Sequence, residues 1–224
     1  YRGSRNLVPE NLESVQLTGS VSLLDDRLKG TLNLFYNNLT DFIFRNNSAG
    51  PTDPIYQNAG YLQSVGTELE AAWVDKWLHT RGTLTWQGAV AGRDYGNAGL
   101  SIYNVPNWSG SLTADVAPLF VWTDKVWLHA AMRYMGRTLS PVNLTFRDAM
   151  GNELARFNEP NRNIEGAAIV DVGLRVKDLP WKNVFVQGTI YNLLNTRQLI
   201  GGSVVHPYPQ TGRWFLVTIG YTVQ

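Results

Sequence analysis

Residues 14–23 have the sequence SVQLTGSVSL, and this stretch decides the fold. Every odd position carries Val or Leu except Gly19, and every even position carries Ser, Gln or Thr. Because successive side chains of a β-strand point to opposite faces of a sheet, this period of two predicts a strand with one apolar and one polar face. The pattern restarts at Leu28, after Asp25-Asp26-Arg27, and Phe35 is its one exception.

The alternation continues along the whole chain. It recurs in seven further segments, at residues 64–73, 81–90, 108–116, 126–134, 168–177, 184–190 and 214–223. With flanking residues, each of the nine predicted strands is about ten or eleven residues long, which suits a membrane-crossing β-strand and exceeds the usual strand length in globular proteins. No apolar run approaches the roughly 18 residues of a membrane-spanning helix.

The predicted connections alternate in length. Short ones are expected around residues 25–27, 74–79, 118–124 and 178–182, and long ones around residues 37–60, 92–107, 137–164 and 194–211. Short turns at one rim and long loops at the other are typical of outer-membrane barrels. The sequence therefore predicts an all-β fold, an antiparallel transmembrane β-barrel.

Aromatic residues are expected at both ends of the apolar face, where barrels carry girdles of Trp and Tyr. Tyr36, Trp108, Tyr134 and Phe215 would mark the outer end, Trp73 and Tyr221 the inner end, and Trp77, Trp122 and Trp181 the short turns. The alternative is a soluble β-sandwich, whose apolar faces meet in a core. A sandwich needs neither strands of uniform length nor aromatic residues sorted to both ends.

Composition excludes several other classes. Only 17% of the 224 residues are charged and the net charge is +1, whereas nucleic-acid binders usually carry a basic stripe. The chain has no cysteine, so it holds no disulfide and no thiolate metal site.

The number of predicted strands is odd. Bacterial single-chain barrels have an even number of strands and no open edge. We therefore expect the chain to be one piece of a larger barrel.

Four segments of the sequence carry a recognisable set of motifs. They are Asn6-Leu7-Val8-Pro9-Glu10 before the first strand, Phe35-Tyr36-Asn37 to Asp41-Phe42-Ile43, Tyr56-Gln57-Asn58-Ala59-Gly60 with Ser64-Val65-Gly66-Thr67-Glu68-Leu69-Glu70, and Asn192-Leu193-Leu194-Asn195 followed by Pro209-Gln210-Thr211-Gly212-Arg213. Together these segments resemble the C-terminal half of a TonB-dependent outer-membrane receptor; they occur in the family's order and cover nearly the whole chain. The ending Tyr221-Thr222-Val223-Gln224 departs from the aromatic C-terminus common in such barrels.

This resemblance implies that residues 1–224 form the last nine strands of a 22-stranded barrel in the bacterial outer membrane, in contact with lipid and lipopolysaccharide. The plug domain, through which the TonB complex acts, and the earlier strands would lie outside this chain. The implied function is TonB-energised uptake of a scarce, large solute such as a ferric siderophore or similar metal chelate. The alternative is a passive porin-type or structural barrel without energy coupling. A third hypothesis is an outer-membrane enzyme. Such an enzyme needs Ser, His or carboxylate side chains grouped near one rim, and the sequence suggests no such group.

The resemblance assigns ligand capture to the outer loops and the top of the plug. Arginine and aromatic side chains there suit an anionic, ring-bearing ligand through charge-assisted hydrogen bonds and stacking. The candidates in this chain are Arg45, Tyr56, Tyr95, Tyr103, Arg137, Arg147, Arg156, His206 and Tyr208. The same residue types also suit any loop tip beside lipopolysaccharide.

The polar face carries charged side chains that would line the lumen. The candidates for contact with the plug are Glu68, Glu70, Arg81, Arg133, Asp171 and Arg175, beside Lys177. Alternatively, these residues form charge pairs between neighbouring strands on a wall that faces water, and we favour this role for most of them. Each such pair contributes a few tenths of a kcal/mol to stability. The motif residues Asn192, Asn195, Gly212 and Arg213 are expected to be structural.

No catalytic constellation and no cofactor motif is present in the sequence, so we expect no enzyme activity. His79 is predicted in a short turn, His129 on the polar face of a strand and His206 in a long loop. Histidines this scattered along the sequence do not predict a metal site.

Overall fold

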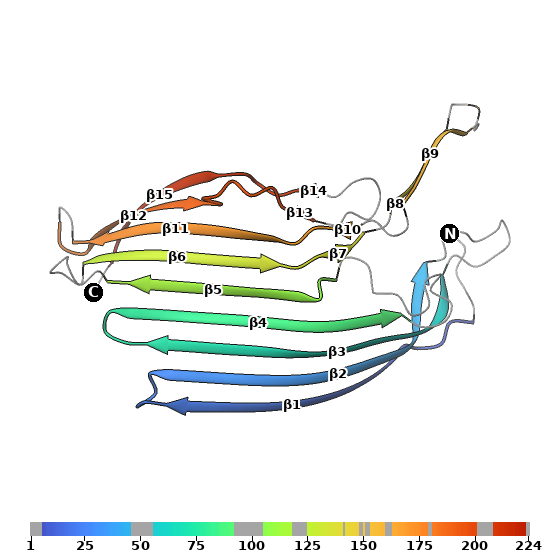
Figure 1. Cartoon of the computed structure of the whole chain (residues 1–224), viewed down its shortest axis with the longest axis horizontal. Coiled ribbons are helices and arrows are strands. Elements are labelled where there is room, and N and C mark those ends of the chain that lie inside the picture. The colour runs from blue at the N-terminus through green and yellow to red at the C-terminus, as the bar shows by residue number, and fades with distance from the viewer. Residues whose placement is uncertain are drawn as a thin grey trace.

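The computed structural model describes residues 6–45, 56–91, 105–117, 125–140, 142–147, 150, 153–159, 163–178, 181–200 and 208–222. Nine of its strands form one antiparallel sheet in chain order (Figure 1). They are β1 (Asn11–Leu23), β2 (Leu28–Arg45), β3 (Tyr56–Val74), β4 (Leu78–Ala91), β5 (Trp108–Val116), β6 (Val126–Met135), β11 (Ala167–Lys177), β12 (Val184–Tyr191) and β15 (Trp214–Tyr221). The nine predicted strands are thus confirmed in number and order, but their lengths run from 8 to 19 residues rather than the expected ten or eleven. No helix among the described residues is long and apolar enough to cross a membrane.

Three short two-stranded sheets lie within two of the predicted long loops. They pair β7 (Thr138–Leu139) with β10 (Asn163–Ile164), β8 (Val142–Arg147) with β9 (Glu153–Glu159), and β13 (Leu199–Ile200) with β14 (Tyr208–Pro209). The predicted connections over residues 137–164 and 194–211 are long, as expected, but they contain these short strands, which the sequence analysis does not predict. Strands of two residues are too short to show an alternation, whereas residues 142–147 alternate between apolar and polar side chains, so β8 could have been recognised from the sequence.

The hairpin of β2 and β3 is longer than predicted. These strands have 18 and 19 residues, so most of the expected loop over residues 37–60 is paired sheet. The segment before β1 follows this extension: Asn58 Nδ2 donates to the Val8 carbonyl at 2.9 Å, and the Glu10 carboxylate accepts from the Ile43 amide at 2.6 Å. Consequently Tyr36 lies in the middle of β2 rather than at its outer end.

The remaining aromatic predictions agree with the structure where it describes them. Trp108, Tyr134 and Phe215 lie at strand ends near the long connections, and Trp73 and Tyr221 at strand ends near the short turns. Trp77 and Trp181 lie in short turns and are exposed. Trp122, with the predicted short connection 118–124, lies outside the described residues.

Two of the short turns depend on Asp and Asn in the left-handed region of backbone space, where these residues are enriched. Asp25 and Asp26 have φ values of 54° and 65° between β1 and β2. Between β11 and β12, Asp178 and Asn183 have φ values of 58° and 65°, and the Asn183 amide donates to the Asp178 carboxylate at 2.8 Å. These turns set the register of the strands they join.

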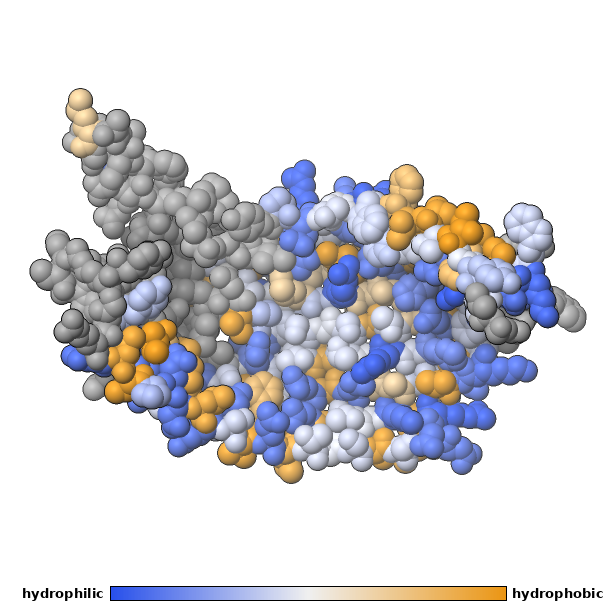
Figure 2. Space-filling view, turned by 180° about the vertical axis from the view of Figure 1, so that it is seen from behind, coloured by the Kyte–Doolittle hydropathy of each residue, from blue (hydrophilic) through white to orange (hydrophobic). Residues whose placement is uncertain are grey.

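The register places the predicted apolar residues on one face. Leu32, Leu69 and Leu84 are directly opposite one another on β2, β3 and β4, and all three are exposed. Figure 2 shows hydrophobic side chains, in orange, at the surface of the described part of the chain. The only buried hydrophobic residues among the described ones are Phe42, Ile164 and Ile169. The described residues form one layer, so the alternative of a two-sheet sandwich with an apolar core is wrong.

Phe35, the exception to the alternation, lies on the polar face because of a glycine. Phe35 is directly opposite Gly66 on β3. Its ring occupies the space that a Cβ at Gly66 would need, and the Trp86 carbonyl oxygen lies 2.5 Å from that Cβ position. A glycine beneath an aromatic ring thus lets a large apolar side chain lie flat on a polar wall.

This packing predicts that Gly66→Ala destabilises the full-length protein by about 1–3 kcal/mol, because the new methyl group forces the Phe35 ring and the backbone to move. The control is Gly19→Ala, since nothing lies within 4 Å of a Cβ at Gly19 and its effect should stay within about 0.5 kcal/mol. Urea unfolding in lipid vesicles, followed by tryptophan fluorescence, measures both. Equal effects of the two substitutions would contradict the assignment.

Candidate functional site

The polar face of the sheet is a hydrogen-bonded wall. Thr18 Oγ1 donates to Asn33 Oδ1 at 2.9 Å, and Asn33 Nδ2 donates to a carboxylate oxygen of Glu68 at 3.0 Å. Similar side-chain bonds link Ser14 to Asn37, Asn37 to Ser64, Ser20 to Thr31, and Thr83 to Ser111. Each bond joins residues on neighbouring strands, so the polar side chains brace the sheet across its strands.

Oppositely charged side chains on this face pair across strands. Arg81 Nη2 lies 2.8 Å from a Glu70 carboxylate oxygen, and Arg133 Nη2 lies 3.1 Å from a carboxylate oxygen of Asp171. The Glu70–Arg81 pair is open to solvent, with side chains 43% and 63% exposed, so it contributes little to stability. Of the predicted lumen residues, Glu68 bonds to Asn33, and Arg175 has no ion pair among the described residues.

Asp171 anchors the connection that follows β12. Its side chain is buried, and besides Arg133 it accepts a hydrogen bond from the Asn192 amide at 2.8 Å. Asn192 is 3% exposed; its Oδ1 accepts from the Thr196 amide at 2.8 Å, and its Nδ2 donates to the carbonyl oxygens of Thr196 and Thr211. Through these bonds, Asp171 and Asn192 fix the backbone of the connection after β12.

The second asparagine of the motif continues this arrangement. Asn195 Oδ1 accepts a hydrogen bond from the Arg213 amide at 3.0 Å, which ties the residues after β12 to the start of β15. Asn192 and Asn195 have φ values of 51° and 52°, a region in which asparagine is tolerated better than most residues. The closing motif is therefore a backbone clamp.

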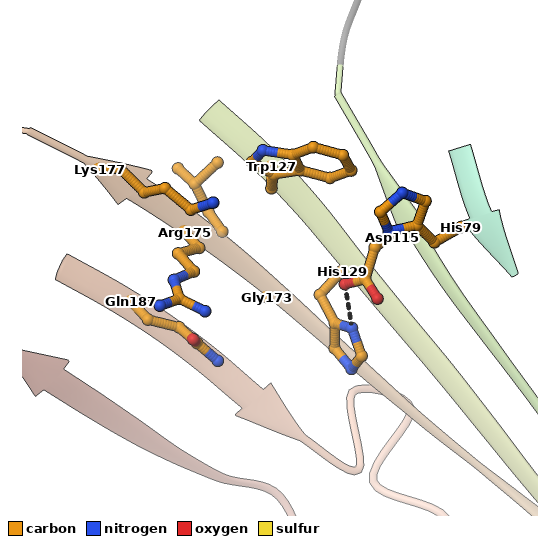
Figure 3. A pocket seen from close by; sticks show the side chains of 9 residues that line it. His79, Asp115, Trp127, His129, Gly173, Arg175, Lys177 and Gln187 are labelled. Carbon is orange, nitrogen blue, oxygen red and sulfur yellow. Dashed lines mark hydrogen bonds and ion pairs between the residues drawn. The ribbon is translucent and has the colours of Figure 1, made fainter. Parts of the chain in front are cut away.

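Two of the three histidines lie near each other, contrary to the sequence interpretation. His79 belongs to β4, not to a short turn, because β4 starts at Leu78. His79 is directly opposite Asp115 on β5, and Asp115 is directly opposite His129 on β6. His129 Nδ1 lies 2.8 Å from a carboxylate oxygen of Asp115 (Figure 3). Among the described residues, no group of three His, Asp or Glu side chains is placed to hold a metal ion.

The outer-loop candidates fall into three groups. Tyr56 begins β3 and Arg137 follows β6, and both are exposed. For four others the structure describes the backbone: Arg45 in β2, directly opposite Tyr56; Arg147 and Arg156 on the β8–β9 hairpin; and Tyr208 in β14. Tyr95, Tyr103 and His206 lie outside the described residues. The described candidates all lie at the rim of the long connections.

Sequence reasoning missed the set of residues around His129. The alternation over residues 108–116 places Asp115 on the polar face but predicts no role for it, and no motif in the sequence includes Trp127 or Gln187. Their proximity follows from the register across β5, β6, β11 and β12, which aligns Asp115 with His129 and Trp127 with Arg175. Counting outward from each predicted short turn would have given part of this alignment.

The clamp at Asn192 yields a stability prediction. Asn192→Ala removes three side-chain hydrogen bonds and places alanine at positive φ, so we expect a loss of about 2–4 kcal/mol in the full-length protein. Leu194→Ala in the same turn is the control, since Leu194 is 64% exposed and its loss should cost less than about 1 kcal/mol. Urea unfolding in lipid vesicles compares the two; a milder effect of Asn192→Ala would count against the clamp.

Comparison with known proteins extends this description. Residues 1–193 match the family described as TonB dependent receptor-like, beta-barrel. No curated protein sequence matches the chain.

Solved receptor structures share the fold. The closed form of the ferric-catecholate import receptor Fiu from E. coli K12 has 23% identity and a TM-score of 0.71, over 98% of this chain and 29% of that one. The siderophore receptor PiuA from Acinetobacter baumannii has 16% identity and a TM-score of 0.70, over 94% of this chain and 28% of that one. The ferripyoverdine receptor of the outer membrane of Pseudomonas aeruginosa has 15% identity and a TM-score of 0.70, over 98% and 28%.

The chain thus spans less than a third of the length of these three structures, and its open sheet corresponds to part of a barrel wall. The family match extends over most of the sequence, from residue 1 to residue 193. The chain therefore belongs to the family of TonB-dependent receptor-like β-barrels.

Proposed function

We propose that residues 1–224 are the C-terminal part of the barrel of an outer-membrane receptor that takes up a scarce, large solute with energy supplied through TonB. The observation that carries this proposal is the single sheet with one exposed apolar face and one hydrogen-bonded polar face, in a chain of the TonB-dependent receptor-like family. The solute we propose is a ferric siderophore or a similar metal chelate.

The apolar face supports a place in a membrane. Val15, Leu17 and Val65 are 68%, 68% and 48% exposed, and no described element covers them. Lipid tails would cover such a face, whereas the polar face would line the water-filled or plugged lumen. The edge strands β1 and β15 would pair with further strands of the complete barrel, because an unpaired strand edge is too costly in hydrocarbon.

The rim of the long connections supports ligand capture from outside. It carries the exposed Tyr56 and Arg137 and the backbone positions of Arg45, Arg147, Arg156 and Tyr208. Arginine forms strong bonds to anionic oxygens, and tyrosine offers a ring for stacking. Solved structures of similar fold include receptors for ferric catecholates and ferripyoverdine. An iron chelate with anionic, aromatic groups therefore suits this rim.

Growth under iron limitation tests the proposed function. The full-length gene is expressed in a strain that lacks its own siderophore receptors, and single ferric siderophores are supplied as the iron source. We expect at least one siderophore to restore growth, and we expect the rescue to disappear when the tonB gene of the host is deleted. Growth that does not depend on TonB would favour the passive porin, and no rescue by any siderophore would overturn the proposed solute.

The rim also gives a site prediction. The double substitution Arg137→Gln and Arg147→Gln should weaken binding of the rescuing ferric siderophore by about tenfold or more, since bonds from arginine to anionic oxygens are lost. The matched control is Arg27→Gln at the opposite rim, where Arg27 lies 3.7 Å from Asp75. Fluorescence quenching with the purified full-length protein measures each affinity. If the double variant and the control bind the siderophore with equal affinity, these two arginines do not belong to the binding site.

A further inference from the structure

A hollow lies in the polar face near the rim of the short turns. It has a volume of about 270 Å³, and its lining side chains come from the first residues of β4, β6 and β12 and the last residues of β5 and β11. Figure 3 shows Arg175, Lys177 and Gln187 on one side of it, and Trp127, His129 and Asp115 on the other. The outer-loop candidates lie at the opposite rim, so this hollow is separate from the proposed site of ligand capture.

The hollow has an excess of positive charge. Arg175 and Lys177 project from the same face of β11, and neither has an ion pair among the described residues. Asp115 is the one carboxylate among the described lining residues, and its side chain is bonded to His129 at 2.8 Å. The two cations of β11 therefore face a space whose described lining holds one carboxylate, that of Asp115, and neither cation forms an ion pair with it.

Aromatic rings, rather than carboxylates, hold these cations in place. The Arg175 guanidinium carbon lies 4.1 Å from the centroid of the Phe185 ring, and Lys177 Nζ lies 5.8 Å from the centroid of a Trp127 ring. A cation over a ring face is attracted to it but keeps its N–H donors for other partners. Arg175 Nε is buried and has no hydrogen-bond partner in the part of the chain that the structure describes. The described residues therefore leave this donor of Arg175 unsatisfied, which is uncommon for a buried polar group.

We propose that this hollow is a binding site for a carboxylate group, held by Arg175 and Lys177 with Gln187 as an additional donor. A planar guanidinium forms two parallel bonds to a carboxylate, which suits Arg175, while the ammonium of Lys177 adds a point charge. The volume suits a small carboxylic acid or one acidic side chain rather than a whole siderophore. The proposal rests on the proposed function in one respect, because the polar face must line the lumen of the barrel.

The carboxylate has two possible sources, which the test separates. One source is a free anion that travels through the lumen, and the other is an Asp or Glu side chain of the same protein outside residues 1–224. Citrate is the probe for the first source, measured by equilibrium dialysis with the full-length protein in detergent. A zero-length carbodiimide reaction is the probe for the second, because it joins Lys177 to a carboxylate in contact with it, and mass spectrometry identifies the linked peptides.

The variants are Arg175→Gln and Lys177→Gln, with Lys29→Gln as the matched control. Lys29 is an exposed lysine on the same face, on β2, and does not line the hollow. We expect each hollow variant to weaken citrate binding by about tenfold or more and the control to leave it unchanged. The shift in gel mobility on heating shows that each barrel is folded. Lys177→Arg keeps the charge and should bind citrate within about threefold of wild type.

The outcomes decide the proposal. Citrate binding that depends on Arg175 and Lys177 assigns the site to a free anion. A cross-link from Lys177 to an acidic residue outside residues 1–224, absent in Lys177→Gln, assigns it to the protein itself. The proposal is overturned if citrate does not bind and Lys177 forms no cross-link, or if the hollow variants bind citrate as the control does. Neither measurement uses a siderophore or TonB, so a failed growth test leaves this result interpretable.

Discussion

Alternation of side chains along each strand is the constraint on which the rest of this structure depends. The register aligns Leu32, Leu69 and Leu84 in one row and Asn33, Glu68 and Thr85 in the next. A slip of one residue between two strands would exchange the two faces. It would then move Glu68 to the face that we assign to lipid, where charge is unfavourable. The register of the central strands is thus specified by the composition of both faces at once.

The polar face has two roles, one in holding the strands together and one, which we propose, in binding. Most of its side chains bond to one another across strands, as Thr18, Asn33 and Glu68 do, and these bonds stiffen a sheet that has no second layer among the described residues. Asp171 joins this wall to the clamp at Asn192. The hollow near His129 differs, because its cations of β11 rest on aromatic rings and have no carboxylate partner among the described residues. A structural wall and a binding surface can therefore share one face.

Much of the fold could be predicted from the sequence, because period-two alternation needs only local information. The nine long strands, their two faces and most of the aromatic positions follow from it. The extension of β2 and β3 could not be predicted, since it involves bonds between residues far apart in sequence: Glu10 with Ile43, 33 positions apart, and Val8 with Asn58, 50 positions apart. The two-residue strands could not be predicted, because strands of that length carry no periodic signal. β8 has six alternating residues and could have been recognised.

The sites were harder to predict than the fold. Asn192 and Arg213 were assigned a structural role from the motif alone, and their contacts agree with that role. The hollow depends on residues from five strands, and its recognition needs the register, which the sequence defines only near short turns. Ligand capture at the outer rim stays a prediction, because several of its candidates, such as Tyr95, lie outside the described residues.

The proposed function requires that one face of this sheet contacts lipid. Spin labels at single-cysteine variants of residues 84–87 in the full-length protein, reconstituted in lipid vesicles, test it most directly. We expect high collision rates with oxygen at Leu84 and Trp86 and low rates at Thr85 and Gln87, because oxygen concentrates in the hydrocarbon core. Oxygen accessibility without this period of two, or highest at Thr85 and Gln87, would contradict the assignment of the faces.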